Sequence, residues 1–199
     1  ADSTGREKRH NDNRKNSNNM GYFSLDIKKA KGTSDTTQSD HIERKIIPKN
    51  ADPTRTHLNR VLVEYPDGVH GRDEAIAHRL NTAGIRRKIT HDQVRVVRVV
   101  LSGTHEDMMN IQEKGELDEW CSDSIQWLQA TFGKDNVVAA HLHMDEKTPH
   151  IHAAVVPIVT GERRKAKKEQ TDGKRKYRKK TNSVRLCADD LFNRQTLVA

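Results

Sequence analysis

The sequence predicts an α+β domain in which helices pack on one antiparallel sheet. Strand-like and helix-like segments alternate along the chain, and β-branched runs mark the strands. The last two predicted strands, residues 136–143 and 150–158, are joined by a turn too short for a crossover, so this pair is antiparallel. The chain of 199 residues is long enough for one core with tails, but not for two full domains.

The first predicted elements lie before residue 70. Residues 21–28 are rich in aromatic and apolar side chains and form a strand. A short helix follows, because residues 33–35 offer capping side chains and Pro48 stops it. Residues 58–65 are rich in Val and Leu and are predicted as a second strand, closed by the turn at residues 66–68.

A helix is predicted next, at residues 71–83. It places Ala75, Ile76 and Leu80 on one face, which is the pattern of a helix that packs against a sheet. Gly84 follows at the position where a left-handed residue ends many helices.

The middle of the chain combines a strand with a long helical region. Residues 93–101 are mostly β-branched and form the strand. Thr104 with Asp107 can cap the helical region that follows, residues 105–132, which is expected to break at Gly115. Its inward side chains are expected to be Leu117, Trp120, Ile125, Leu128 and Phe132.

Composition separates a folded part from solvated segments. Apolar residues make up 33% and charged residues 32% of the chain, against roughly 45–50% and 25% in typical globular domains. Residues 1–19 contain almost nothing that packs and are expected to be a disordered leader or a segment added in cloning. We expect the folded domain at 20–160, a basic arm or loop at 161–182, and the start of a further helix at 183–199, where the chain is cut off.

The excess of positive charge sits in one segment. The net charge is +8, and residues 161–180 hold eleven Lys or Arg against three acidic residues, which leaves 25 of each sign elsewhere. A charge run is usually a solvated tail. Its proximity in sequence to the histidine-rich hairpin described below favours DNA as a polyanionic partner, with Tyr177 able to stack on a base.

Cysteine usage and hydropathy restrict the location of the protein. Cys121 and Cys187 lie far apart with no second cysteine near either, which gives no sign of a disulfide framework or a thiolate zinc site. No stretch approaches the roughly 20 apolar residues of a membrane span, and no secretory signal is found. These features predict a cytoplasmic protein.

Histidines cluster in the last predicted hairpin. Four of the eleven fall within residues 141–152. Alternate residues of a strand share a face, so His150 and His152 point the same way, and His143 can lie beside them across the hairpin. Three converging imidazoles suit a divalent cation with open positions for substrate. His141 is either an extra ligand or, as is more common for such a residue, a hydrogen-bonded strand histidine.

The turn of this hairpin adds two carboxylates. Asp145 and Glu146 could complete the metal shell, orient a ligand or accept a proton, and spacing does not decide between these roles. A hairpin with surface histidines is the simpler interpretation, but three facing histidines with acids in the turn favour a metal site. Imidazoles accept Mn, Fe, Co, Ni, Cu or Zn, so the ligands leave the metal open.

Three segments resemble one protein family. Residues 143–152 (HMDEKTPHIH) closely resemble the H-x-D-E-x-T-P-H-x-H motif of the MobV, or Pre/Mob, plasmid mobilisation relaxases, within the wider HUH endonucleases. Residues 41–44 (HIER) resemble the H-x-E-R element of that family, and residues 52–59 (DPTRTHLN) resemble its N-P-S-R-S-H-L-N element. The resemblance implies a single sheet with a central metal-binding hairpin. It also implies a catalytic domain at 20–160 that nicks and rejoins one DNA strand at a transfer origin.

The resemblance also implies the central roles. The metal ligands would be His143, His150 and His152, with Mn²⁺ or Mg²⁺ as the expected ion. The nucleophile that stays bound to the 5′ phosphate would be His41, which otherwise resembles a helix-surface histidine. Some proposals for the family placed a tyrosine after the H-L-N element, but that position is Arg60 here.

Further residues are expected to assist the cleavage. Glu146, or alternatively Glu43, would fix the tautomer of His41 and stabilise its imidazolium. Arg44 and Arg55 would contact phosphates. The partners implied are the transfer origin, as a single strand or hairpin around the nick, and a conjugation coupling protein. The expected DNA-binding residues are Arg55, His57, Asn59, Arg163, Arg164, Lys165, Lys167, Lys168, Lys174, Arg175, Lys176, Tyr177 and Arg178.

Two other function classes fit part of the sequence. An unrelated histidine-metal enzyme, such as a hydrolase or an iron oxygenase, would need neither His41 nor the basic arm. A noncatalytic origin-binding module would bind DNA and form no covalent product. A covalent DNA adduct therefore separates the relaxase from both alternatives.

Overall fold

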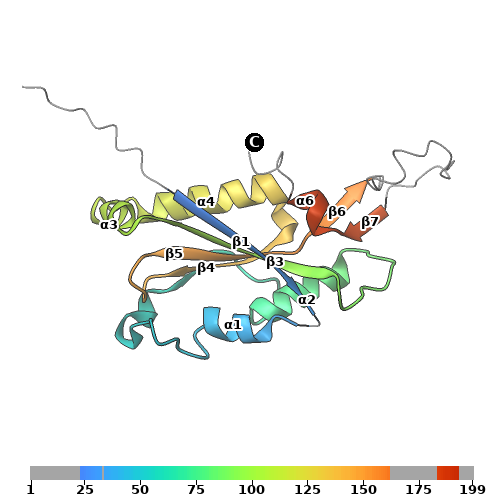
Figure 1. Ribbon diagram of the computed structural model, residues 1–199, viewed down its shortest axis with the longest axis horizontal. Helices are drawn as coiled ribbons and strands as arrows, with labels where there is room; N and C mark the ends of the chain where they lie inside the picture. Colours follow the sequence, from blue (N-terminus) through green and yellow to red (C-terminus); the bar gives the residue numbers. More distant parts are fainter. Residues whose placement is uncertain (1–22, 33, 162–182, 193–199) are drawn as a thin grey trace, which may run out of the picture.

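A five-stranded sheet forms the centre of the molecule, in the order β1-β3-β5-β4-β2, and every neighbouring pair is antiparallel (Figure 1). The structure is a computed structural model that describes residues 23–32, 34–161 and 183–192. The strands of this sheet are β1 (Phe23–Lys31), β2 (Arg60–Val61), β3 (Val94–Gly103), β4 (Val137–His143) and β5 (His150–Val155). The predicted α+β class is confirmed.

Helices cover both faces of the sheet. In Figure 1, α3 and α4 lie on one side, and α1 and α2 lie on the other. The described helices, including 3-10 turns, are α1 (Thr36–Ile42), η1 (Pro53–Leu58), α2 (Arg72–Thr82), α3 (His105–Glu113), α4 (Leu117–Phe132), η2 (Lys134–Asn136) and α6 (Ala188–Leu191).

The larger core lies between the sheet and α4. Leu128 and Phe132 of α4 pack with Leu142 of β4 and with Ile151 and Ala153 of β5, all buried. Burying one such aliphatic or aromatic side chain contributes about 1.5–3 kcal/mol. This packing confirms the inward residues predicted for the helical region. Gly115, with φ of 74°, separates α3 from α4, as predicted.

The opposite face carries the histidines. A smaller core joins Ile76 and Leu80 of α2 to Ala139 of β4 and Ala154 of β5. Successive side chains of a strand alternate between faces, so the residues that share the face of Ala139 and Ala154 are those at even steps along each strand. These residues are His141, His143, His150 and His152. The alternation therefore places the histidines under α1 and α2, away from the larger core.

The second predicted strand was wrong for most of its length. Residues 58–65 contain only the two-residue β2, and η1 precedes it. Asp52 starts η1 by accepting a hydrogen bond from the backbone N–H of Thr54 at 2.9 Å. Beyond β2, the backbone N–H of Leu62 still reaches the carbonyl of Ala140 at 2.8 Å. The capped turn therefore occupies the start of the predicted strand, and beyond Val61 the backbone of Leu62 makes one further contact with β4.

The last predicted strand is divided in two. Strand β5 ends at Val155, and β6 (Ile158–Gly161) begins after Pro157, which has no N–H to donate to a ladder. Strand β6 pairs with β7 (Ser183–Leu186), which we did not predict. Of the further helix predicted at 183–199, the described residues contain the short helix α6 (Ala188–Leu191), and residues 193–199 lie outside the described part. The expected leader lies outside the described residues, and the domain boundaries stay predictions.

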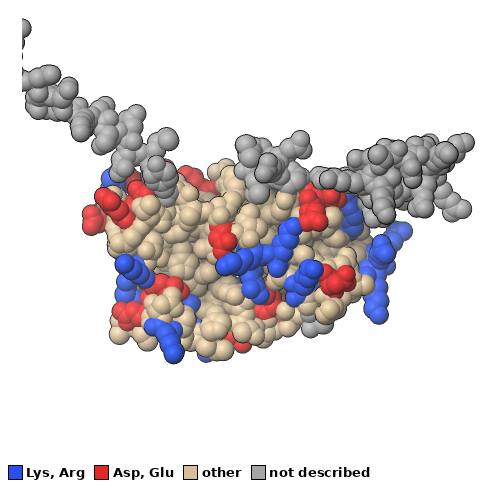
Figure 2. Space-filling view, in the orientation of Figure 1, with Lys and Arg blue, Asp and Glu red and all other residues tan. Residues whose placement is uncertain are grey.

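The remaining predicted elements agree with the structure. Strand β1 begins near its predicted start but continues to Lys31, and α2 matches the helix predicted at 71–83. Gly84 has φ of 74°, the left-handed conformation expected after that helix. Within the described part of the chain, no helix is long and apolar enough to cross a membrane. Acidic and basic side chains are interspersed on the face shown in Figure 2.

Candidate metal centre and its polar surroundings

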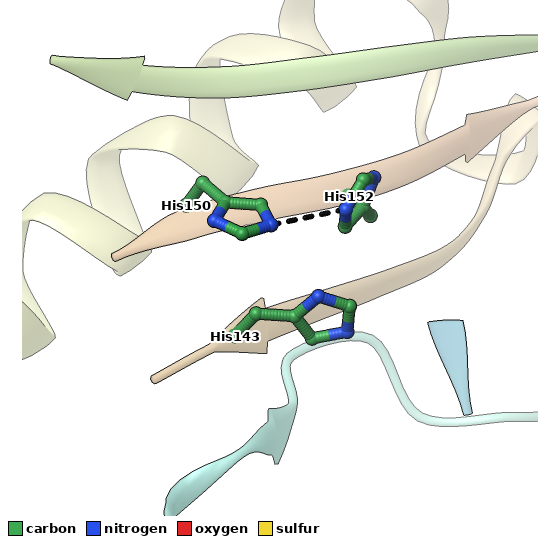
Figure 3. Close-up of side chains that lie close together, drawn as sticks. All are labelled: His143, His150 and His152. Carbon is green, nitrogen blue, oxygen red and sulfur yellow. Dashed lines mark hydrogen bonds between the residues drawn. The ribbon is translucent and has the colours of Figure 1, made fainter. Parts of the chain in front are cut away.

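His143, His150 and His152 converge on one side of the β4–β5 hairpin. His143 lies directly opposite His150 in the register. One nitrogen from each imidazole lies within 4.8 Å of the other two, and the ring centroids are 4.8 to 5.2 Å apart. Figure 3 shows the three rings facing one another from the two strands. The structure therefore brings together the three ligands that the resemblance implied.

Backbone carbonyls orient two of the three rings. Nε2 of His143 lies 2.9 Å from the carbonyl oxygen of Ile42, and Nδ1 of His150 lies 2.9 Å from that of Thr148. A carbonyl only accepts, so each of these nitrogens carries a proton and the other nitrogen of each ring keeps its lone pair; that of His143, Nδ1, lies 3.1 Å from Nη2 of Arg44. Nε2 of His150 lies 3.1 Å from Nε2 of His152. Carbonyl contacts of this kind fix the tautomers of metal-binding histidines.

Burial keeps the imidazoles of His143 and His152 neutral. It lowers the pKa of His143 to about 3, with a further contribution from the positive charge of Arg44. Burial also lowers the pKa of His152, to about 2. A ligand that is already deprotonated loses no proton when it binds a cation. The donor set therefore fits a divalent metal ion.

A buried acidic turn adjoins the histidines and is held by Arg44. Asp145 is 1% exposed and accepts two hydrogen bonds from Arg44, from Nε at 2.8 Å and from Nη2 at 2.6 Å. Burial raises the pKa of Asp145, but the Arg44 contacts outweigh it and hold the pKa well below its usual value. Nη2 of Arg44 also donates to Glu146 at 2.9 Å. Glu146 Oε1 lies 3.9 Å from one nitrogen each of His143 and His150.

These contacts restrict what Arg44 can do. Its side chain is 7% exposed, and two more groups contact it: the carbonyl of His41 accepts from Nη1 at 2.8 Å, and Nδ1 of His143 lies 3.1 Å from Nη2. Arg44 also has φ of 56°, a left-handed conformation that is rare for a residue with a side chain. Its geometry is that of a residue that positions the acidic turn. The phosphate contact expected of it stays a prediction.

His41 lies in the last turn of α1, one residue before the residue that contacts the histidine cluster. Its neighbour Ile42 supplies the carbonyl that holds His143. Among the described residues, the His41 imidazole has no hydrogen bond to either carboxylate expected to assist it. Glu146 instead accepts hydrogen bonds from Arg44 and Asn50. Glu43 contacts Tyr65 and the backbone of Arg72.

Glu43 belongs to a second polar cluster. Its Oε1 lies 3.1 Å from the hydroxyl of Tyr65 and accepts from the backbone N–H of Arg72 at 2.6 Å. The Tyr65 oxygen lies 3.1 Å from Nε2 of His141. Burial, with the negative charge of Glu43, raises the pKa of Tyr65 far above its usual value, which disfavours Tyr65 as a nucleophile. His141 is therefore a hydrogen-bonded strand histidine, not an extra member of the three-histidine group.

The segment at residues 52–59 supports the acidic turn. Oδ1 of Asn59 accepts from the backbone N–H groups of Met144, at 2.7 Å, and Asp145, at 3.2 Å. The Thr56 hydroxyl donates to Asp145 at 3.2 Å. Sequence reasoning assigned Asn59 to DNA and missed this structural role. Of the other expected DNA contacts in this segment, Arg55 is half-buried and His57 is exposed.

A buried ion cluster that sequence reasoning missed holds the start of α1. Asp35 is 6% exposed and accepts from Nη1 of Arg72 at 2.6 Å and from the guanidinium of Arg98. Ser39 also accepts from Arg72, at 2.9 Å. The three charged residues are distant in sequence, so no local spacing could have revealed the cluster.

The strands that flank the expected basic arm lie away from the turn of the histidine hairpin. Residues 163–178 lie outside the described residues, but the strands on either side of them, β6 and β7, are described. Figure 1 shows this pair of strands at the end of the molecule opposite the β4–β5 turn. The strands that flank the arm pack against the base of the histidine hairpin, through Ile158 and Leu186, and lie away from the turn that carries the histidines. DNA binding by these residues stays a prediction.

The fold and the histidine cluster together define the class. A crystal structure of the MobM relaxase domain (MOBV; Mob_Pre), bound to plasmid pMV158 oriT DNA and Mn at pH 4.6, matches with a TM-score of 0.66 at 21% identity. The match covers 88% of this chain and 80% of that chain. A Mn-bound form with a 3′-thiophosphate, at pH 6.8, also matches with a TM-score of 0.66. The chain thus has the fold of a relaxase domain.

The chain belongs to the plasmid recombination enzyme (Mob/Pre) family, whose model matches residues 17–190. Plasmid recombination enzyme type 3 of Staphylococcus aureus is 31% identical over 154 residues, which covers 74% of this chain and 36% of that protein. A plasmid recombination enzyme of Bacillus thuringiensis is 32% identical over 115 residues, covering 58% of this chain and 21% of that protein. The chain spans about a third or less of the length of these relatives. The resemblance to Pre/Mob proteins is confirmed.

Proposed function

We propose that this chain is the nicking module of a relaxase, which cuts and rejoins one DNA strand at a transfer origin through a covalent 5′-phosphate adduct on His41. One observation carries the proposal: the Ile42 carbonyl binds His143 at 2.9 Å, so the end of α1 is attached to the histidine cluster. A nucleophile on that helix end would act next to a bound metal ion. Membership of the plasmid recombination enzyme family supports the same reaction class.

His143, His150 and His152 would hold the metal ion, with Mn²⁺ or Mg²⁺ expected. When bound, the ion would supply positive charge to a nonbridging oxygen of the scissile phosphate. The lowered pKa values of His143 and His152 support this assignment, because both rings are already deprotonated at neutral pH. The Mn-bound state of the structurally similar relaxase domain agrees with it.

The protein residues would carry out the transesterification. A nitrogen of His41 would attack phosphorus and form the P–N bond while the bond to the 3′ oxygen breaks. The 3′ oxygen would leave as a hydroxyl after taking up a proton. Because the P–N bond of this phosphoramidate retains the free energy of the broken phosphoester, the 3′ hydroxyl could attack phosphorus, release His41 and rejoin the strand without ATP. Glu146, or alternatively Glu43, would stabilise the imidazolium; the position of Glu146 beside the histidine cluster supports it as the first candidate.

The remaining roles follow from this proposal. Arg55, His57 and Asn59 would contact the DNA, the basic residues between 163 and 178 would bind its backbone, and Tyr177 would stack on a base. A conjugation coupling protein would be a second partner, and the cytoplasm would be the site of action.

A nicking assay tests the proposal. Supercoiled plasmid that carries the transfer origin of the chain's own element is incubated with Mn²⁺ and protein. We expect open circles from the wild type and from His91→Ala, a control at an exposed histidine outside the site. His41→Ala should give none. DNA binding without nicking by any of the three proteins would refute the catalytic proposal and favour the noncatalytic origin-binding module.

A further inference from the structure

Glu43 connects the end of α1 to the start of α2. It is the first residue after α1 and lies two positions after His41. We propose that Glu43 is a positioning residue, which fixes the end of α1 against α2 and thereby sets the place of His41 relative to the histidine cluster. The inference rests on the proposed function, in which His41 is the nucleophile, and gives Glu43 a role that needs no contact with the His41 imidazole.

The Glu43 carboxylate has partners on three sides. Its Oε1 accepts hydrogen bonds from the backbone N–H of Arg72, the first residue of α2, at 2.6 Å and from the Tyr65 hydroxyl at 3.1 Å. Its Oε2 lies 3.0 Å from Nζ of Lys45, and the side chain is 13% exposed. Both oxygens are therefore held away from His41, so Glu43 acts on His41 through the backbone.

Gly71 permits the close approach of this carboxylate to α2. A Cβ atom at Gly71 would lie 3.1 Å from Oε1 and 3.3 Å from Oε2 of Glu43, closer than the usual optimum for non-bonded atoms of roughly 3.5–4.0 Å. The φ of Gly71 is −172°, an extended conformation that any residue adopts. The backbone alone does not call for glycine here, and the space that glycine leaves is filled by Glu43.

The start of α2 also holds the other end of α1. Asp73 accepts hydrogen bonds from the backbone N–H of Asp35 and from the Thr36 hydroxyl, both at 2.9 Å. The Arg72 side chain donates to Asp35 at 2.6 Å. A helix of seven residues is too short to be stable by itself, so its position follows from these contacts. Glu43 makes the contact at the end that carries the proposed nucleophile.

Glu43 and Arg44 hold this end from two directions. Glu43 contacts α2 and Tyr65, whereas Arg44 contacts Asp145 in the turn of the histidine hairpin. Without Glu43, the Arg44 contacts would remain and the side toward α2 would be released. A misplacement of about 1 Å can slow a reaction about 100-fold, because the reacting atoms must be aligned.

The first test compares two substitutions of Glu43 in single-turnover nicking. Glu43→Ala should slow nicking about 100-fold. Glu43→Gln keeps an oxygen that accepts from Arg72 and Tyr65, so it should restore most of that loss. Glu119→Ala, at an exposed position on α4, is the control. DNA binding, measured by fluorescence anisotropy without metal ion, should match the wild type in every variant.

Two outcomes of this comparison would overturn the inference. If Glu43→Gln is as slow as Glu43→Ala, the charge of Glu43 matters and not the position that it fixes. If DNA binding falls as much as nicking does, Glu43 supports the DNA-binding surface and not the place of His41.

Gly71→Ala tests the same contact without changing Glu43. The added methyl group would displace the carboxylate by a few tenths of an ångström and should slow nicking about three- to tenfold. Because the effect passes through Glu43, the double variant Glu43→Ala/Gly71→Ala should be no slower than Glu43→Ala alone. Additive losses would contradict this coupling. If Glu43→Ala fails to fold, Gly71→Ala and Glu43→Gln still decide the question.

A distance measurement separates the inference from the proposed function. Bound Mn²⁺ speeds the nuclear relaxation of nearby histidine rings, and ¹⁵N-labelled histidine with His41→Gln for assignment identifies the His41 signal. The relaxation of His41 should change in Glu43→Ala and Gly71→Ala and should keep its wild-type value in Glu43→Gln. An unchanged value in Glu43→Ala would overturn the inference even if wild-type protein nicks DNA. The expected changes in a wild type that does not nick would refute the proposed function alone.

Discussion

Arg44, the second residue after α1, forms two parallel hydrogen bonds with Asp145 in the turn of the histidine hairpin, at 2.8 and 2.6 Å. Both side chains are almost fully buried. This pair joins the segment that carries His41 to the turn beside the metal ligands.

Arg44→Lys should weaken metal binding while the fold survives. Lysine keeps the charge but loses the planar fork that binds a carboxylate through two bonds, so the acidic turn would be less well ordered. Loss of such outer contacts typically costs about 10–100-fold in metal affinity. Calorimetric titration with Mn²⁺ measures the affinity, and Arg87→Lys, at an exposed position, is the control. Equal affinities for both variants would contradict a positioning role for Arg44.

His150→Ala and His143→Ala should differ in their effect on folding. Each removes one ligand and should abolish tight Mn²⁺ binding, measured by the loss of free Mn²⁺ signal in electron paramagnetic resonance. His143 is 1% exposed and is tied to Ile42, whereas the His150 side chain is 13% exposed. His143→Ala should therefore lower the free energy of unfolding by about 2 kcal/mol more than His150→Ala does. Unchanged Mn²⁺ binding by either variant would exclude the three-histidine site.

Asp35→Asn should destabilise the protein strongly. The neutral side chain would leave Arg72, which is 1% exposed, with no charged partner, and breaking a buried ion pair on one side costs about 3–5 kcal/mol. Urea unfolding measures the change. Asp92→Asn, at an exposed turn, is the control. A loss below about 1 kcal/mol would show that the cluster does not hold α1 on the sheet.

Stability should fall as the pH drops below neutrality. Burial lowers the pKa of His141 to about 4, His143 to about 3 and His152 to about 2, each below the ordinary value of 6.5. Below pH 6.5 the unfolded chain therefore binds more protons than the folded chain, and the free energy of unfolding decreases. Between pH 7 and pH 5, in the presence of a chelator, we expect a loss of at least about 2 kcal/mol. Constant stability over this range would contradict the neutral, buried state of these rings.

The histidine site could be predicted because its information is local. Strand alternation and one short turn bring His143, His150 and His152 together whatever the rest of the fold does. The supporting contacts could not be predicted in this way. Arg44 meets Asp145 across 101 positions, and Arg72 meets Asp35 across 37, so both pairs depend on how α1 docks on the sheet.

The two errors in the predicted strands, at β7 and at residues 58–65, have a similar explanation. Strand β7 contains only two apolar residues, Val184 and Leu186, and becomes a strand through pairing with β6. The segment at 58–65 has strand propensity, but the Asp52 cap and the contacts of Asn59 with the acidic turn replace most of the expected ladder. In both places tertiary contacts outweigh local preference.

Mapping the covalent DNA adduct tests the central claim most directly. The protein is incubated with Mn²⁺ and an oligonucleotide that spans the cut site, digested with trypsin, and the DNA-linked peptide is sequenced by mass spectrometry. We predict a 5′-phosphate on His41 that acid releases, as expected for a P–N bond. An adduct on Tyr65 or another residue, or nicked DNA with no adduct, would contradict the assignment of His41 as the nucleophile.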